Sequence, residues 1–476
     1  MKDSTTRIAD MELSDVRTPL GTMDRAGLAL QEARGYAMEA FPAVRLEGPL
    51  DADLFKQAYL ESLDIFPRMK QIVEFEGEGR QKRFYWREVR SDLSHTFILQ
   101  DLDVADDSLE SADTAFVPIQ QEMLNAPGID MTRGIGIRIY LYRTGPTRHY
   151  ALIRFNHILS DGRGMMIFAN FWILRYEELL KDPDSPVRAE PFRMPEEQEV
   201  RIWTMLKWVG WKSIVRFIRG MLRSLRLGRK MPVAHLADFK YGLKGRFRTW
   251  DSHLAPEKLL ELRSRAKAMG MTMNDLALAA GYHTVLRFCS REGIEVKRMK
   301  INSPKDIREE DSTQVFNLAV PRVISLIPAE IRDDHHLIET IREELRRIMD
   351  SKIYFLGALG VNLLGKLSFD RLVRIIRRQM ERGHNPAATI LISNVGEITS
   401  FGSFNALGEA VTAHLYHGAR GQYPPGYITP LFSFKGTMTL GFGYYEPAMT
   451  EEKCARLGSI FFEELERISK LDLGDQ

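Results

Sequence analysis

Hydrophobic residues recur at two different spacings near the start of the chain. Residues 41–50 (FPAVRLEGPL) are typical of a strand that ends in a Gly-Pro turn. Residues 51–73 place their apolar positions at helical spacing, and Asp51 or Asp53 can serve as the N-cap. This part of the chain therefore predicts a strand followed by a helix over 51–73.

A second pattern begins near residue 135. Residues 135–143 (IGIRIYLYR) alternate β-branched or aromatic residues with arginines, and 148–157 (RHYALIRFNH) follow after the turn TGPT. The two segments predict a β-hairpin in which His157 lies where the second strand leaves the sheet. Residues 164–182 are apolar around most of a helix and predict a largely buried one.

The composition changes between residues 181 and 195, where Pro, Asp, Glu and Ser are frequent, as in a linker. Residues 247–254 (FRTWDSHL) alternate like a strand. Residues 255–270 predict a helix with Pro256 near its first position and Gly270 as its stop.

The end of the chain repeats the alternation of helix and strand. Residues 272–288 predict a helix in which Thr272 and Asp275 form a capping box. Residues 431–468 predict a hairpin across Lys435–Gly436 followed by an amphipathic helix.

These elements predict a mixed α/β protein with two main units. The boundaries we expect are an N-terminal unit over 1–195, an intervening segment over 196–245 and a C-terminal unit over 246–476. No repeat with a fixed period of 20 to 50 residues is present in the sequence.

Composition narrows the functional class. The 476 residues are 44% hydrophobic and 27% charged, which is not a disordered composition, and 66 basic against 64 acidic residues argue against a nucleic-acid-binding protein. Two distant cysteines, Cys289 and Cys454, exclude a disulfide framework and suit a reducing cytoplasm. The N-terminus has no apolar signal-peptide core, and the longest apolar stretch is about half a membrane span. We expect a cytoplasmic protein.

One segment departs from this balance of charge. Residues 201–230 contain nine Lys or Arg and no acidic residue, with basic and apolar stripes at helical spacing. A basic helix of this kind can lie at a membrane surface or dock an anionic partner. It can equally be a crossover between the two units with solvated arginines, and both interpretations stay open.

Candidate chemistry is concentrated in NHILSDGRG, residues 156–164. His157 could be a packed residue, a metal ligand or a proton acceptor. Metal binding through His157 and Asp161 requires a helix, whereas the preceding alternation indicates a strand and SDG is turn chemistry, so we expect no metal. A histidine at a strand exit can project into a cleft as a general base. Asp161 can then fix the local backbone, and Gly162 permits close approach of another chain or a substrate.

Five segments together resemble the acyltransferase superfamily that contains chloramphenicol acetyltransferase, condensation domains and wax-ester synthases. They occur in the expected order and are residues 41–73, NHILSDGRG, MNDLALAAGYHTVL (273–286), SPKDIR (303–308) and ISNVGEI (392–398). The resemblance implies two chloramphenicol-acetyltransferase-like lobes, each an α+β sandwich, with a central tunnel and His157 at its middle. Asn156 stands where many members have a first histidine, and the Asp-Phe-Gly-Trp-Gly motif of the plant branch is absent.

The resemblance also implies roles for particular residues. Asp161 would form a structural ion pair with Arg308, which could otherwise be a solvated loop arginine. Asn274 would contribute to the site or only start its helix. Ser393 and Asn394 would be turn residues that line the tunnel. The oxyanion of the reaction would be stabilised near Gly162 or near Ser393 and Asn394, and these alternatives stay open.

The function implied is acyl transfer from a thioester to a hydroxyl acceptor. The donor would be an acyl-coenzyme A or a phosphopantetheine-linked acyl group, with an acyl carrier protein as a partner in the second case and no bound cofactor. Two alternatives stay open: a free-standing condensation enzyme that forms an amide, and a non-catalytic member that binds lipid or docks a partner. The sequence contains no Gly-x-Ser-x-Gly elbow, phosphate-binding loop or dinucleotide fingerprint.

Overall fold

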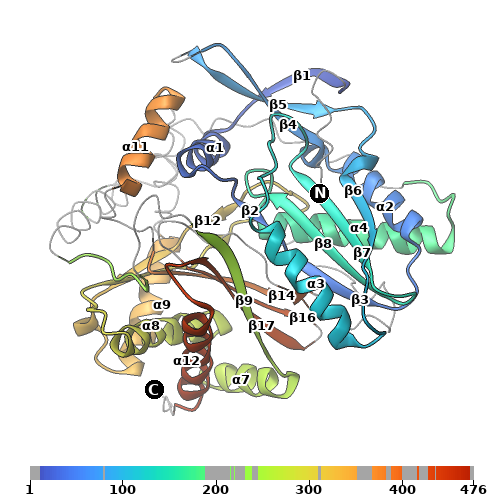
Figure 1. Ribbon diagram of the computed structural model, residues 1–476. Coiled ribbons are helices and arrows are strands. Elements are labelled where there is room, and N and C mark those ends of the chain that lie inside the picture. Colours follow the sequence, from blue (N-terminus) through green and yellow to red (C-terminus); the bar gives the residue numbers. More distant parts are fainter. Residues whose placement is uncertain are drawn as a thin grey trace.

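Two lobes, each built around a β-sheet, lie side by side in the computed structural model (Figure 1). The structure describes residues 11–78, 81–187, 215, 219, 231–237, 245–308, 312–350, 367–381, 388–398, 415–416, 427–434 and 436–471. The basic segment 201–230, apart from positions 215 and 219, and most of the predicted linker 181–195 lie outside the described residues. Within the described chain, no helix combines the length and the apolar character needed to cross a membrane.

The N-terminal lobe has a sheet with helices on both faces. In spatial order its strands are β15 (Leu415–Tyr416), β3 (Ala43–Glu47), β8 (Arg148–Asn156), β7 (Ile137–Arg143) and β6 (Phe97–Asp101), with β2 (Glu39–Ala40) also paired to β8. The predicted hairpin is confirmed, because β7 and β8 pair antiparallel. Its neighbouring helices are α2 (Ala52–Ile65), α3 (Leu109–Met123) and α4 (Gly162–Lys181).

Alternation along β7 divides the core of this lobe. Ile137 and Ile139 belong to the cluster that α2 and α4 cover. Tyr140 and Tyr142 belong to a separate cluster with Phe116 of α3. Successive residues of a strand point to opposite faces, so the apolar run of β7 serves both faces of its sheet.

The predicted helix over 51–73 is shorter than expected. The Asp51 side chain caps α2 by accepting hydrogen bonds from the backbone N–H groups of Asp53 and Leu54 at 3.0 Å each. The α-helix ends at Ile65, because Pro67 disfavours helical backbone in the residue before it and cannot donate a helical hydrogen bond. A 3₁₀ turn over Pro67–Lys70 follows, and β4 (Gln71–Glu76) pairs with β5 (Arg83–Val89), which also pairs with β1 (Leu13–Pro19).

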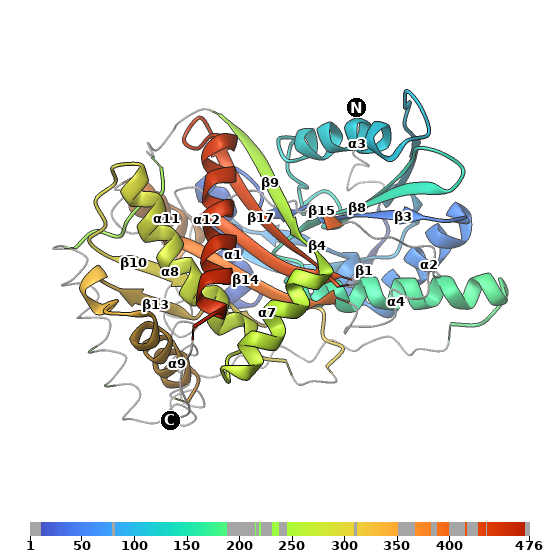
Figure 2. The ribbon, with the colours of Figure 1, turned by 90° about the horizontal axis from the view of Figure 1, so that it is seen from below.

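In the described part of the C-terminal lobe, helices pack against the lobe's own sheet (Figure 2). The strands in spatial order are β13 (Val323–Leu326), β10 (Met299–Asn302), β14 (Ile390–Glu397), β16 (Tyr427–Phe434), β17 (Thr437–Glu446) and β9 (Arg246–Leu254). The helices are α7 (Pro256–Ala268), α8 (Met273–Arg291), α9 (Asp334–Asp350) and α12 (Glu451–Ser469). The capping box is confirmed, since the Thr272 hydroxyl accepts from the Asp275 N–H and the Asp275 carboxylate accepts from the Thr272 N–H.

Several C-terminal segments contact the N-terminal lobe. Helix α11 (Phe369–Glu381) packs against α1 (Thr22–Arg34), and the Phe369 ring lies 4.6 Å from that of Phe84. Strand β15 extends the N-terminal sheet by pairing with β3. A short ladder of β11 (Lys305–Asp306) and β12 (Ala319–Val320) carries the loop that approaches the candidate site.

Candidate active site

His157 is the first residue after β8, and hydrogen bonds hold its backbone on both sides. Its N–H donates to the carbonyl of Met38 at 2.7 Å. Its carbonyl accepts from Nδ2 of Asn317 at 3.0 Å, and the same nitrogen donates to the Ile158 carbonyl at 2.9 Å. The imidazole is exposed and makes no hydrogen bond to any described residue. Its ring lies 6.1 Å from that of Phe155, between centroids. An exposed imidazole without a hydrogen-bond partner among the described residues can accept a proton from a bound molecule.

The turn after His157 is held by a buried arginine. Arg68 donates from Nε to the Leu159 carbonyl at 3.3 Å and from Nη2 to the Ile158 carbonyl at 3.4 Å. The guanidinium is itself fixed by Asp24 at 2.8 Å and lies 3.6 Å from the ring centroid of Trp86. These contacts place the turn on the core of the N-terminal lobe.

Asn156, which stands at the position of a histidine in many superfamily members, has a structural role here. Its Oδ1 accepts from Nε2 of Gln31 at 2.7 Å and from the Ile158 N–H at 3.1 Å. The side chain is buried, and its hydrogen bonds support the turn that follows β8.

The expected contact between Asp161 and Arg308 is present, and both side chains are buried. Asp161 Oδ2 accepts from Nη1 of Arg308 at 3.0 Å and from the N–H groups of Leu318 and Ala319 at 2.7 and 3.0 Å. Oδ1 lies 2.9 Å from Nη2 of Arg308 and accepts from the Gly164 N–H at 2.8 Å, which caps α4. Asp161 thus joins the start of α4 to the loop that follows β11.

Two glycines of the motif have different surroundings. A Cβ at Gly164 would collide with the Val315 carbonyl and with the Ser160 hydroxyl, which donates to that same carbonyl. A Cβ at Gly162 would meet no atom within 4 Å, and this residue is exposed. The close approach of another segment of the chain therefore occurs at Gly164 and not at Gly162. The approach of a substrate to Gly162 stays a prediction.

The remaining candidates lie in the C-terminal lobe. Asn274 is the second residue of α8, and its Oδ1 accepts from the Ser303 hydroxyl at 3.1 Å. The expectation of a turn at Ser393 and Asn394 is wrong, because both residues belong to β14. Ser and Asn favour turns, but here the backbone departs from regular pairing only through a bulge that ends at Gly396, whose φ is 84°.

Sequence reasoning missed the two residues that clamp the motif turn, Asn317 and Arg68. Both donate to main-chain carbonyls. Asn317 lies outside the segments with a recognisable pattern, and the helical spacing around Arg68 concerns apolar positions and gives no role to the arginine. Pro67 next to Arg68, and Trp86 against its guanidinium, occur in many kinds of structure. Only the fold therefore shows that Arg68 and Asn317 bind the carbonyls of the motif turn.

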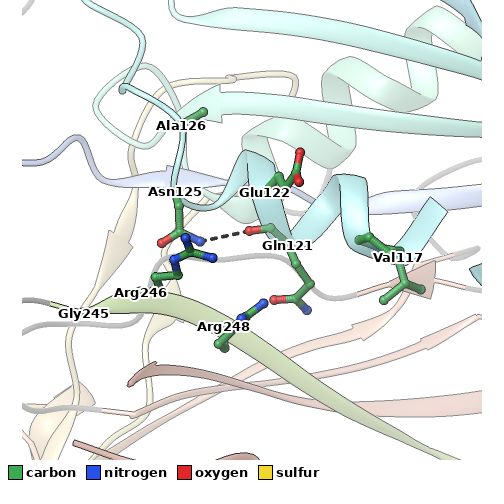
Figure 3. Close-up of a pocket in the computed structure, with 9 residues that line it drawn as sticks. Val117, Gln121, Glu122, Asn125, Ala126, Gly245, Arg246 and Arg248 are labelled. Atoms are coloured by element: carbon green, nitrogen blue, oxygen red, sulfur yellow. Dashed lines mark hydrogen bonds between the residues drawn. The ribbon is translucent and has the colours of Figure 1, made fainter. Parts of the chain in front are cut away.

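A pocket of about 800 Å³ lies where α3 of the N-terminal lobe faces β9 of the C-terminal lobe (Figure 3). Its lining residues are Val117, Pro118, Gln121, Glu122, Asn125, Ala126, Gly245, Arg246 and Arg248. None of them belongs to the His157 motif, and the predicted central tunnel stays a prediction.

Comparison with known proteins identifies the fold. No family model matches the sequence, and no curated protein matches it. Among solved structures, the first condensation domain of the calcium-dependent antibiotic synthetase is 15% identical, with a TM-score of 0.68 over 96% of this chain and 97% of that one. The trichothecene 15-O-acetyltransferase of Fusarium sporotrichioides is 14% identical, with a TM-score of 0.65 over 98% of both chains.

A third matching structure is named for a different reaction. The epimerization domain from the third module of tyrocidine synthetase B is 15% identical, with a TM-score of 0.63 over 98% of both chains. These proteins share two lobes and cover nearly the whole chain, but their printed activities differ. The predicted fold class is confirmed: the chain has the two-lobed α/β fold of these condensation, epimerization and acetyltransferase structures.

Proposed function

We propose that this protein is an acyltransferase that moves an acyl group from a thioester to a hydroxyl acceptor, with His157 as the general base. One observation carries the proposal: an exposed imidazole without a hydrogen-bond partner among the described residues stands on a backbone that Met38 and Asn317 fix from two sides. A general base requires this combination of accessibility and fixed position.

The chemistry needs no covalent enzyme intermediate, because the thioester is already activated. The neutral His157 ring takes the proton of the acceptor hydroxyl as the oxygen attacks the thioester carbonyl. The tetrahedral intermediate then expels the thiolate, which receives the proton from the imidazolium and leaves as a thiol. For the oxyanion, Gly162 offers a main-chain N–H at the start of α4, where such groups have no acceptor within the helix.

Asp161 and Arg308 act on this chemistry through the backbone. Their side chains are buried and satisfy one another and the loop, so they hold the residues on either side of the turn and do not contact the reactants. We assign both as positioning residues.

The test is thiol release from a panel of acyl-coenzyme A donors with alcohol acceptors. Both cysteines are buried, which keeps the background with a thiol reagent low. His157→Ala should lower the rate by about 10²- to 10⁴-fold, the usual size of a general-base contribution. His336→Ala, a histidine on α9 in the other lobe, is the matched control and should retain the wild-type rate. Near-normal turnover by His157→Ala would contradict the assignment.

Amide formation is the second candidate, since the condensation domain matches this fold as well as the O-acetyltransferase does. Replacing the alcohols by amines in the same assay separates the two reactions. A protein that binds acyl donors equally well with and without His157, and releases no thiol from any donor, would instead be a non-catalytic member.

A further inference from the structure

The pocket between α3 and β9 contains charged groups that the proposed chemistry does not use. Figure 3 shows Arg246 and Arg248 projecting from β9 toward α3. They are two residues apart on one strand, so their side chains leave the same face of the sheet. Arg246 is exposed, and its guanidinium makes no ion pair or hydrogen bond with the described part of the chain. Arg248 donates from Nε to the Glu446 carboxylate at 3.1 Å.

The amide side chains on the opposite wall are already engaged. Gln121 donates to the carbonyl and hydroxyl of Thr249 at 3.1 and 2.7 Å, and accepts from the Thr249 N–H at 3.2 Å. Asn125 donates to the Phe247 carbonyl at 2.9 Å and accepts from its N–H at 2.8 Å. These contacts fasten α3 to the edge of β9, so the pocket wall is preformed and its amides have little capacity for a ligand.

The groups that remain available in the pocket suit a ligand that has anionic, polar and apolar parts. The guanidinium of Arg246 and the terminal nitrogens of Arg248 suit phosphate oxygens, which arginine binds with paired N–H donors. Glu122 is exposed and can accept from a hydroxyl or amino group. Val117 and Pro118 add apolar surface for a flat ring. A volume of about 800 Å³ is in the range of small-molecule and cofactor sites.

We propose that this pocket binds the 3′-phosphorylated adenine nucleotide end of coenzyme A, which makes acyl-coenzyme A the donor in place of a carrier-bound acyl group. This inference rests on the proposed acyltransferase function. The nucleotide supplies phosphates for the two arginines, ribose hydroxyl and adenine amino groups for Glu122, and an aromatic base for the apolar wall.

The pocket also adjoins the backbone that holds the candidate base. Ala126 lines it, and the carbonyl of the next residue, Pro127, accepts from Nη2 of Arg154. Arg154 precedes His157 by three residues on β8, at most about 11 Å of extended chain. This contact connects the pocket wall to β8, and the proposal directs the acyl-bearing arm of the donor toward the end of that strand.

Two measurements test the proposal on the full chain. In the first, adenosine 3′,5′-bisphosphate is titrated by calorimetry at low salt into wild type, Arg246→Gln and the control Arg332→Gln, another exposed arginine. We expect wild type and Arg332→Gln to bind alike. Arg246→Gln should bind about tenfold more weakly, because it loses a charged hydrogen-bonding group. Absence of binding to wild type, or equal binding by Arg246→Gln, would overturn the proposal whether or not the protein is an enzyme.

In the second measurement, one acyl group is presented on coenzyme A and on N-acetylcysteamine, which lacks the nucleotide. Arg246→Gln should raise KM about tenfold for the coenzyme A thioester and leave KM for the short thioester unchanged. An equal change for both donors, or no change for either, refutes the inference while the acyltransferase proposal stands. If no donor releases thiol, the proposed function fails, and the nucleotide titration still decides whether the pocket is a nucleotide site.

Discussion

Replacing Asp161 with alanine removes the carboxylate that neutralises a buried guanidinium. Arg308 has no exposed side-chain surface, and its two terminal nitrogens lie 3.0 and 2.9 Å from the oxygens of Asp161. The same carboxylate accepts from the N–H groups of Leu318, Ala319 and Gly164. Asp161→Ala therefore leaves three backbone donors without their acceptor and removes one of the two carboxylates that contact the buried guanidinium.

The magnitude follows from the sum of two losses. A buried charge left without its partner costs roughly 3–5 kcal/mol, and loss of a helix N-cap costs about 1 kcal/mol. Arg308 keeps three other contacts, with the Asp306 carboxylate at 2.8 Å and with the carbonyls of Gln314 and Phe316. These partners reduce the penalty on the charge, so we expect Asp161→Ala to lower the free energy of unfolding by about 3–4 kcal/mol in total.

Denaturant unfolding of wild type, Asp161→Ala, Arg308→Met and the double variant measures this value. The double variant contains no unpaired buried charge, so its loss should be smaller than the sum of the single losses by about 1–3 kcal/mol. Thiol release should stay low in all three variants, because each lacks the contact between Asp161 and Arg308 that holds the motif turn against the loop. A loss below about 1 kcal/mol for Asp161→Ala, or strictly additive losses, would refute the assignment of a buried structural pair.

Three further predictions concern the motif and one buried lysine. Gly164→Ala should lower the free energy of unfolding by about 1–3 kcal/mol in denaturant melts through overpacking, whereas Gly162→Ala should not lower it; equal losses would contradict the contact geometry. Asn317→Ala should reduce kcat about tenfold with about 1 kcal/mol lost in stability, since it frees the His157 carbonyl; an unchanged kcat in steady-state assays would contradict this role. Burial, and then the charge of a neighbouring arginine, lower the pKa of Lys300 to about 8, below its unfolded value. The unfolded state then binds more protons between pH 8 and 10, so wild-type stability should rise over that window relative to Lys300→Met in paired melts; parallel curves would contradict it.

Elements with strong local signals were predictable from sequence. Asp51 caps α2, and Thr272 with Asp275 caps α8, because a side-chain oxygen satisfies N–H groups only a few residues away. Pro256 begins α7, and Gly270 follows its end with a positive φ of 62°. Each of these contacts is local, so the residues that make it are close in the sequence as well.

Boundaries set by competition between signals were less predictable. The apolar spacing over 51–73 continues past Ile65, while Pro67 stops the helix. Ser393 and Asn394 have the composition of a turn, yet they pair in parallel with β16. In the first case, the missing N–H and fixed ring of proline override the apolar pattern. In the second, the hydrogen bonds of the sheet override the turn preference of Ser and Asn.

Residues that act on the motif across long sequence separations could not be predicted from spacing. Asn317 is 160 residues from the carbonyl it binds, and Arg308 is 147 residues from Asp161. The Asp161–Arg308 pair was expected only through the family resemblance, and Asn317 lies outside the five segments that carry it. Every residue has a main-chain carbonyl, so a side chain that binds one does not require a particular residue type as its partner. Such a contact therefore cannot be inferred from the types of the two residues.

The position of the candidate base therefore depends on both halves of the chain. Within the N-terminal half, β8 delivers His157 to the end of the sheet, but Ser160 and Asp161 are buried polar residues whose main partners come from residues 306–319. Without that loop, the buried carboxylate and hydroxyl would lose most of their hydrogen bonds, and the turn would have to rearrange to reach water. The geometry of NHILSDGRG therefore depends on the loop that packs over it, so the short motif alone is a weak indicator of the candidate site.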